Sequence, residues 1–352
     1  MGGGPIGEFP RFLSLATGWI PFSLAEFVVA LVVGRQVVGL VGGVREYRGR
    51  VDAPGRLALR GGLRFAQDLG ILLFLFYLLW GIHYARPGVE DRLDLPQRGP
   101  VPTEELRELA EVLVERTNAL YLEVHGTPDL GGPTPRPALD SLLPELEAAW
   151  EKAREGWGLR NRVARPHGAP KVFLLTPLVR PFQIAGMYFP YTGEALVMAD
   201  LPGAQLPKDL AHEMAHQRGT ARESDANVLA YLVTIGAEDP RIRYSGTLFL
   251  QRQFLATLIP LDPEGAATLI ESRYPGVQRD VDAIREYWLR SRGPVGEAST
   301  RMNDAMLRSH GIPEGVASYG GSVWVVAALA RREGIEAVTA PLRLPPPAPN
   351  ER

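Results

Sequence analysis

The sequence predicts an α+β protein in which N-terminal transmembrane helices precede a mostly helical domain with a small β-sheet. Three observations support this class. Two long apolar stretches lie in the first quarter of the chain, strand-like segments gather near its middle, and helical periodicity continues through most of the C-terminal half. The pattern His212-Glu213-Met214-Ala215-His216 lies directly after the strand-like segments.

Composition excludes several classes of protein. A net charge of -2 over 352 residues gives no basic surplus for nucleic acid, so we expect no nucleic-acid partner. The chain has no cysteine, which excludes disulfides and every metal site or nucleophile built on a thiol. Apolar residues make up 45% of the chain but are concentrated in its first quarter, which favours a membrane anchor.

The first expected membrane span is residues 22–44. Residues 1–11 are rich in glycine and lack the Lys/Arg cluster of a signal peptide. Arg35 near the middle of the span would cost about 2.5–3.5 kcal/mol on the insertion scale. Glu26 is nine residues away and on the opposite helix face, so it cannot simply neutralise Arg35.

The second expected span is residues 69–82, extended by flanking residues. It ends in Trp80 and Tyr84, aromatic residues typical of a membrane interface. An arginine-rich segment, residues 45–64, separates the two apolar runs, and the positive-inside rule places it in the cytoplasm. The alternative is a buried helical hairpin of a soluble protein.

This topology places the rest of the chain outside the cytoplasm. We therefore expect a multi-pass protein of a bacterial cell membrane, with an extracytoplasmic domain and the lipid bilayer as a partner. A start outside the cytoplasm without a signal also leads us to expect a further, upstream transmembrane helix. The expected regions are an anchor (1–84), a linker (85–102), a domain (103–340) and a disordered proline-rich tail (341–352).

The domain begins with helical segments and continues with strands. Helices are expected over residues 103–124, then through Leu142, Leu146 and Trp150. Further helices are expected over residues 222–232, 242–258, 281–290, 298–308 and 322–332. Strands are expected over residues 171–176, 184–190 and 194–198. A strand just before the His-Glu-x-x-His helix is a candidate edge strand for an extended substrate, and a plain structural hairpin is the alternative.

The His-Glu-x-x-His pattern predicts a zinc site. Residues four apart lie on one helix face, so His212 and His216 can converge on one ion while Glu213 lies beside them. Gly219 can end the helix at positive φ and turn the next segment back toward the metal. That segment carries Glu223 and Asp225, so a third ligand is available. The alternative is two surface histidines on an ordinary amphipathic helix.

Four ordered blocks of the sequence are distinctive: residues 80–86, 186–195, 212–217 with 223–227, and 315–320. Together they resemble an uncharacterised bacterial domain-of-unknown-function family of membrane-anchored, zincin-like proteins. The resemblance implies a zincin-like metallopeptidase domain outside the membrane, with zinc as cofactor and a peptide or protein as substrate. Members of the family begin with a further membrane helix, and many have glutamate at the position of Asp225.

The third zinc ligand is expected to be Glu223. The segment Glu223-x-x-Ala226-Asn227 resembles the E-x-x-A-D ligand helix of other membrane metallopeptidases, with Asn227 in place of the aspartate. Asp225 is the alternative ligand. An acidic first helical turn, stabilised by the helix dipole, would explain both carboxylates without a metal.

Glu213 is expected to act as the general base that takes a proton from zinc-activated water. An oxyanion donor is also needed, and Tyr319 is preferred over Tyr244 and His310 because it lies in a matched block. Two other functions stay open. The protein could bind zinc without turnover in a regulatory role, or it could be a structural component of an envelope complex.

Overall fold

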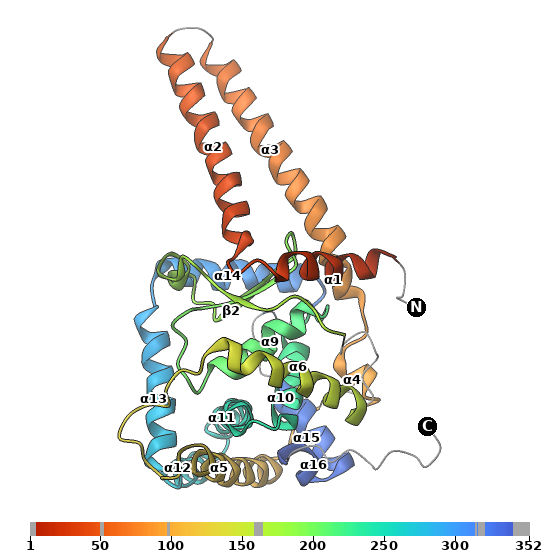
Figure 1. Ribbon diagram of the computed structural model, residues 1–352, viewed down its shortest axis with the longest axis vertical. Helices are drawn as coiled ribbons and strands as arrows, with labels where there is room; N and C mark the ends of the chain where they lie inside the picture. Colours follow the sequence, from red (N-terminus) through yellow and green to blue (C-terminus); the bar gives the residue numbers. More distant parts are fainter. Residues whose placement is uncertain are drawn as a thin grey trace.

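The structure is a computed structural model, and it describes residues 5–49, 53–96, 99–157, 165–313, 315 and 321–340. Two long helices project from one end of a largely helical body, as Figure 1 shows. The body contains one small three-stranded sheet. This arrangement confirms the α+β class expected from the sequence. Tyr319 and residues 341–352 lie outside the described residues.

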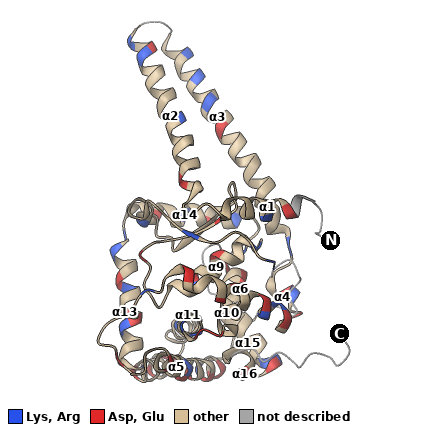
Figure 2. Cartoon of the chain, in the orientation of Figure 1, with Lys and Arg blue, Asp and Glu red and all other residues tan. Residues whose placement is uncertain are grey.

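The projecting helices are α2 (Leu24–Arg48) and α3 (Pro54–Leu79). Both are long and apolar enough to cross a membrane, and almost none of their apolar windows is buried against the rest of the protein. They contain most of the two expected spans, residues 22–44 and 69–82, but α2 begins only at Leu24 and α3 ends at Leu79. Arginines gather at their far end (Figure 2), where the sequence places the cytoplasmic segment.

The charges within the apolar helices have partners. Arg35 of α2 donates to Asp68 of α3 at 2.8 Å, so its charge is neutralised across the helix pair and not along its own helix. Glu26 lies at the base of α2 and accepts hydrogen bonds from the backbone N–H groups of Leu174 and Leu175, at 2.8 and 2.7 Å. Neither charge therefore stands alone.

Helix α1 (Pro5–Gly18) was not expected from the glycine-rich N-terminus. In Figure 1 it lies across the end of the body from which α2 and α3 project. Its outward face is apolar: 64% of Phe12 is exposed, as is 79% of Trp19 just after the helix. Its inner face packs on the body, where Ser14 Oγ accepts a hydrogen bond from Gln217 of the His-Glu-x-x-His helix at 2.9 Å.

The sheet has the order β1-β3-β2, with β1 (Lys171–Val172) parallel and β2 (Gly186–Phe189) antiparallel to β3 (Glu194–Val197). β2 is thus an edge strand. The strand expected over residues 171–176 is wrong beyond Val172, because the chain turns there and α8 (Thr176–Val179) begins with Pro177 in its first turn.

A buried ion pair joins the sheet to the base of α2. Lys171 Nζ lies 2.5 Å from Glu194 Oε1, and both side chains are almost completely buried. The Glu194 carboxylate also accepts from the backbone N–H groups of Leu24 and Ala25, the first residues of α2. Lys171 donates to the carbonyl of Thr17 at the end of α1. The negative charge therefore caps α2 at its positive end.

The remaining helices surround the sheet and α9. Short helices are η1 (Gly81–Ala85), α4 (Val89–Arg92), η2 (Arg180–Phe182) and α16 (Ile335–Thr339). Longer ones are α5 (Thr103–His125), α6 (Leu139–Gly156), α9 (Leu206–Gln217), α10 (Glu223–Gly236), α11 (Pro240–Leu258), α12 (Pro263–Glu271), α13 (Pro275–Arg290), α14 (Pro294–Ser309) and α15 (Gly321–Glu333). The expected helices of the domain are all present, and α12 was missed.

Helices α9 and α10 form the centre of the body. All twelve residues of α9 are buried, as is every residue of α10 after Glu223. They pack against each other, against α11 and, through α9, against the sheet. The expected linker, residues 85–102, includes η1's last residue and α4, whose Val89 is fully buried against this core. A polar site on α9 is therefore held rigidly from all sides.

Candidate metal centre

The His-Glu-x-x-His pattern lies on α9, as its spacing predicts. Pro207 lies in the first turn of α9, where its fixed φ suits a helix and where a backbone N–H would have no partner within the helix. Leu210, Ala211, Met214 and Ala215 are fully buried and fix the helix in the core. The two histidines therefore project from one face of a helix that cannot rotate.

A glycine turn brings the third group back to α9. Gly219 has φ +87°, and its N–H donates to the carbonyl of His216 at 2.7 Å. Thr220 N–H donates to the carbonyl of Ala215 at 3.1 Å, which closes the turn. Since α10 begins at Glu223, its first side chain faces the histidines across this turn.

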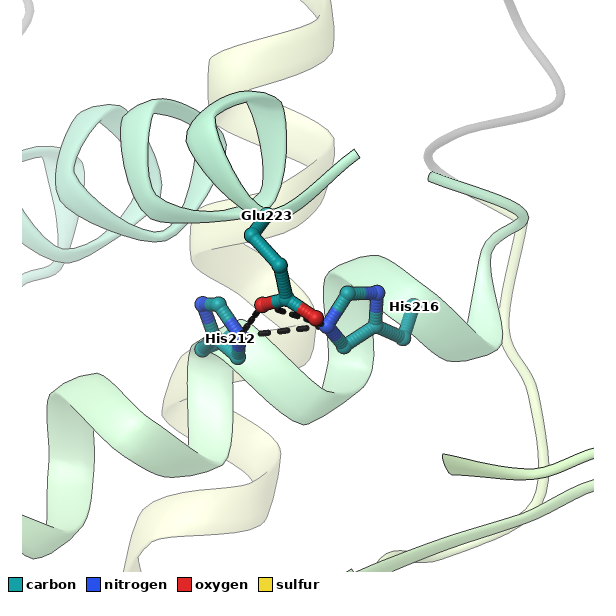
Figure 3. Close-up of side chains that lie close together, drawn as sticks. All are labelled: His212, His216 and Glu223. Atoms are coloured by element: carbon teal, nitrogen blue, oxygen red, sulfur yellow. Dashed lines mark hydrogen bonds and ion pairs between the residues drawn. The ribbon is translucent and has the colours of Figure 1, made fainter. Parts of the chain in front are cut away.

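Three donor atoms converge in Figure 3. His212 Nε2 lies 3.1 Å from His216 Nε2, and Glu223 Oε2 lies 3.1 Å from the first and 3.4 Å from the second. Ligand atoms about 2.1 Å from a tetrahedral zinc ion lie about 3.4 Å apart. The cluster therefore fits a tetrahedral metal ion with one position left open.

The backbone orients one of the imidazoles. His216 Nδ1 lies 2.6 Å from the carbonyl oxygen of Thr220, which can only accept, so Nδ1 carries a proton. In the neutral form of the ring this leaves the lone pair of Nε2 facing the cluster, so a metal ion bound there would replace the proton on Nε2. His212 Nδ1 is buried and has no hydrogen-bond partner among the described residues.

Burial and mutual charge set the protonation of the three groups. Burial, with the nearby Lys208, lowers the pKa of His212 to about 4. Burial also lowers the pKa of His216, but Glu223 outweighs it and raises that pKa to about 9. Burial favours the neutral form of Glu223, yet His216 and His212 together hold its pKa well below its usual range. The Glu223 carboxylate is therefore an anion facing the imidazoles, as a metal site requires.

Glu213 follows His212 on α9 and lies outside the cluster formed by His212, His216 and Glu223. Its side chain is buried, and its Oε2 has no hydrogen-bond partner among the described residues. Burial raises the pKa of Glu213 to about 8. A carboxyl group with a pKa near neutrality exchanges protons readily, which suits a general acid–base.

The cluster forms part of the wall of a cavity of about 690 Å³. His212, Glu213, His216 and Glu223 line it on one side, and edge strand β2 lines it on another. Side chains of α14 and the end of α3, among them Trp80, complete the wall. The ring of Trp80 lies 5.8 Å from that of His216, so the end of a projecting helix is part of the site.

The other sequence candidates lie elsewhere. Asp225 accepts a hydrogen bond from Val89 N–H at 3.1 Å and is outside the donor cluster. Tyr244 donates to Asp280 at 2.6 Å in a separate buried cluster. His310 lies against Tyr84, with ring centroids 4.5 Å apart, and is not among the residues that line the cavity. Tyr319, the preferred oxyanion donor, is outside the described residues.

Three tyrosines that the sequence analysis did not select line the cavity, and one of them, Tyr191, donates its hydroxyl to the carbonyl of Leu72. Burial, with the charge of Glu223, raises the pKa of Tyr84 to about 12. Burial also raises the pKa of Tyr188, whose hydroxyl has no hydrogen-bond partner among the described residues. Tyr84 and Tyr188 lie in blocks that carried the family resemblance, which is the signal that could have identified them.

Lys208 lies one turn before His212 on α9. Its Nζ donates a hydrogen bond to Asn227 Oδ1 at 2.8 Å. Asn227 is the residue that stands in place of the aspartate of the E-x-x-A-D pattern, and its side-chain oxygen is thus a partner of Lys208. The ammonium also lies 3.8 Å from the centre of the Phe249 ring. Lys208 therefore links α9, α10 and α11 beside the metal cluster.

Comparison with known proteins identifies a family but no characterised relative. No curated protein and no solved structure matches the chain. A family model, described as "Protein of unknown function (DUF3810)", matches residues 9–326. This range includes the helix pair, the sheet and the donor cluster, so the chain belongs to the DUF3810 family.

Proposed function

We propose that this protein is a membrane-anchored zinc metallopeptidase of the zincin type, which hydrolyses a peptide bond in a peptide or protein substrate. One observation carries the proposal. His212, His216 and Glu223 converge at metal-ligand spacing, and Glu213, a buried carboxyl group with a raised pKa, lies beside them in one cavity. Metal storage needs the three ligands but gives no reason for Glu213.

His212, His216 and Glu223 would hold the zinc ion. Zinc bound there would supply a Lewis acid that activates water and polarises the scissile carbonyl. Glu213 takes the proton from the attacking water and delivers it to the leaving amine. Tyr84 and Tyr188 are phenol donors in the cavity wall that can stabilise the oxyanion, whereas the hydroxyl of Tyr191 already donates to Leu72.

The edge strand β2 supplies a place for an extended substrate. Among the described strands its residues pair with β3 alone, and they line the cavity beside Glu213. A peptide that adds to the free edge would gain backbone hydrogen bonds and cross the cavity near the donor cluster. Recognition of this kind depends on the backbone and suits a range of peptide sequences.

We further propose that α2 and α3 cross the membrane and that α1 lies in its interface. The exposed apolar face of α1, which includes Phe9, Phe12 and Leu15, lies at the base of the helix pair. The arginines at the other end of the pair favour a cytoplasmic tip and an extracytoplasmic body. The lipid bilayer is then a partner, and the substrate reaches the cavity close to the membrane surface.

The test of this function begins with metal content. Purified full-length protein in detergent should contain about one zinc per chain by elemental analysis. His212→Ala should lose the metal, and His125→Ala, which alters a histidine outside the cavity, should keep it. The zinc-loaded protein should then cleave members of a random peptide library. Absence of zinc after reconstitution, or zinc without any cleavage, contradicts the proposed activity.

A further inference from the structure

A second cavity, of about 480 Å³, adjoins the proposed metal site. The residues that line both cavities are Gln205, Lys208, Asp209, Phe249, Gln253 and Trp288. The second cavity extends away from the donor cluster between α11 and α13. A ligand long enough to occupy both would therefore place one part at the metal centre and another between these helices.

The charged residues that line this second cavity are mostly cationic. They are Lys208, Arg252 and Arg273, against a single carboxylate, Asp209. Lys208 lies 3.3 Å from Asp209, so these two charges compensate each other. The charges of the two arginines remain in excess.

Neither arginine forms an ion pair with a described residue, although the charge of Asp209 acts on Arg252 and that of Asp282 acts on Arg273. Arg252 makes no hydrogen bond or ion pair with the described part of the chain, although it is only partly exposed. Arg273 donates to the side-chain oxygens of Gln251 and Gln278, both at 3.0 Å, and these amides carry no charge. Burial lowers the pKa of Arg252, and burial together with the charge of Arg252 lowers that of Arg273 to about 10. Two guanidinium groups therefore repel each other inside a cavity whose wall contains one carboxylate, Asp209, against three cationic side chains.

Two like charges in a partly buried cavity are energetically costly unless an anion binds between them. Arginine is the residue best suited to hold planar oxyanions, since its guanidinium donates two parallel hydrogen bonds. A carboxylate between Arg252 and Arg273 would remove the repulsion and restore the hydrogen bonds lost by burial. The chemistry of the second cavity is thus that of an oxyanion site.

We propose that Arg252 and Arg273 bind a carboxylate of the substrate whose scissile bond lies at the donor cluster. This inference rests on the proposed peptidase function for the identity of the ligand, but not for the binding of an oxyanion. The carboxylate can come from the C-terminus of the peptide or from an acidic side chain. The arginine pair would then determine where the enzyme cuts, at a fixed distance from a negative charge.

The first experiment measures oxyanion binding without catalysis. The unfolding temperature of full-length protein in detergent is followed against acetate and inorganic phosphate, with chloride keeping the ionic strength constant. We expect both anions to raise it in the wild type, in His212→Ala and in Arg285→Gln, which alters an exposed arginine of α13. Arg252→Gln and Arg273→Gln should lose the response, and Arg252→Lys should keep part of it. An unchanged response in Arg252→Gln, or none in the wild type, overturns the site.

The same variants test the repulsion directly. Without added anion, Arg252→Gln should unfold at the same or a higher temperature than the wild type, because it removes one of two unpaired like charges. A large fall in the unfolding temperature would mean that Arg252 is a structural residue and would contradict the proposal. Arg252→Lys keeps the charge and should not gain stability.

The second experiment tests the link to the substrate. A peptide library is supplied to the zinc-loaded protein in four forms: with and without acidic residues, each with a free or an amidated C-terminus. We expect a preference of about tenfold for one kind of carboxylate, which identifies its source, and loss of that preference in Arg252→Gln. Equal cleavage of all four forms refutes the substrate assignment. Absence of cleavage in every variant refutes the peptidase function alone, because the oxyanion measurement is independent of it.

Discussion

Gly186 of the edge strand β2 lies directly against Glu213 of α9. A Cβ atom at position 186 would come within 2.6 Å of Glu213 Cγ and 2.7 Å of its Oε1. It would also come within 2.5 Å of the backbone oxygen of Leu196 in β3. Strand β2, which we propose pairs with the substrate, is thus in contact with Glu213, the proposed base. Only glycine at position 186 leaves room for this contact.

Gly186→Ala is expected to displace Glu213 and strain β2 while leaving the ligands in place. Peptidase activity should fall by at least about tenfold, since small misplacements of a catalytic group are costly. Zinc content by elemental analysis should stay near the wild-type value. Gly132→Ala is the control, because a Cβ atom there meets nothing within 4 Å. Full activity in Gly186→Ala would contradict the role of this contact.

Glu213→Gln keeps the size of the side chain and removes its ability to take a proton. We expect normal zinc content and a loss of hydrolysis by a factor of about 10²–10⁴, the usual contribution of a general acid–base. Glu336→Gln, which alters an exposed glutamate of α16, should behave like the wild type. Turnover that persists in Glu213→Gln would exclude Glu213 as the base.

The third ligand can be assigned by comparing two carboxylates. Glu223→Gln should weaken zinc binding by more than the roughly 10–100-fold cost of altering a second-shell group, because it removes a ligand. Asp225→Asn should retain the metal, since an asparagine oxygen can still accept the hydrogen bond from Val89. Competition with a zinc chelator of known affinity measures both. The opposite order of effects would make Asp225 the ligand.

The ion pair at the base of α2 is expected to stabilise the junction between helix pair and body. Glu194→Gln leaves the buried Lys171 without its carboxylate, and breaking such pairs costs about 3–5 kcal/mol. Thermal unfolding in detergent should show the loss. The double variant Lys171→Met/Glu194→Gln should recover part of it, because no unpaired charge remains. Equal destabilisation in the single and double variants would argue against a charge effect.

The absence of cysteine allows the position of α1 to be measured without background labelling. Phe12→Cys, carrying an environment-sensitive dye, should report an apolar surrounding when the protein is reconstituted into vesicles. Glu108→Cys on α5, at the opposite end of the body in Figure 1, should report water. Dye emission typical of an aqueous environment at both positions would show that the apolar face of α1 does not lie in the membrane.

The sequence alone determined the features that depend on local periodicity. The two apolar helices follow from run length, the helices of the body from apolar spacing, and the helical placement of His212 and His216 from their separation of four residues. Gly219 predicted the turn after α9, because positive φ is a property of the residue itself. The strand over residues 171–176 was overextended, since the contact of Glu26 with Leu174 and Leu175 comes from a distant part of the chain.

Only the tertiary structure decided what surrounds the donor cluster. The choice between Glu223 and Asp225 depends on the angle between α9 and α10, and spacing in the sequence does not contain that angle. Tyr84, Arg252 and Gly186 reach the two cavities from η1, α11 and β2, which are far apart along the chain. The ion pairs Arg35–Asp68 and Lys171–Glu194 likewise join residues that are distant in the sequence. Partners of buried charges are set by packing, which brings together residues that no local pattern connects.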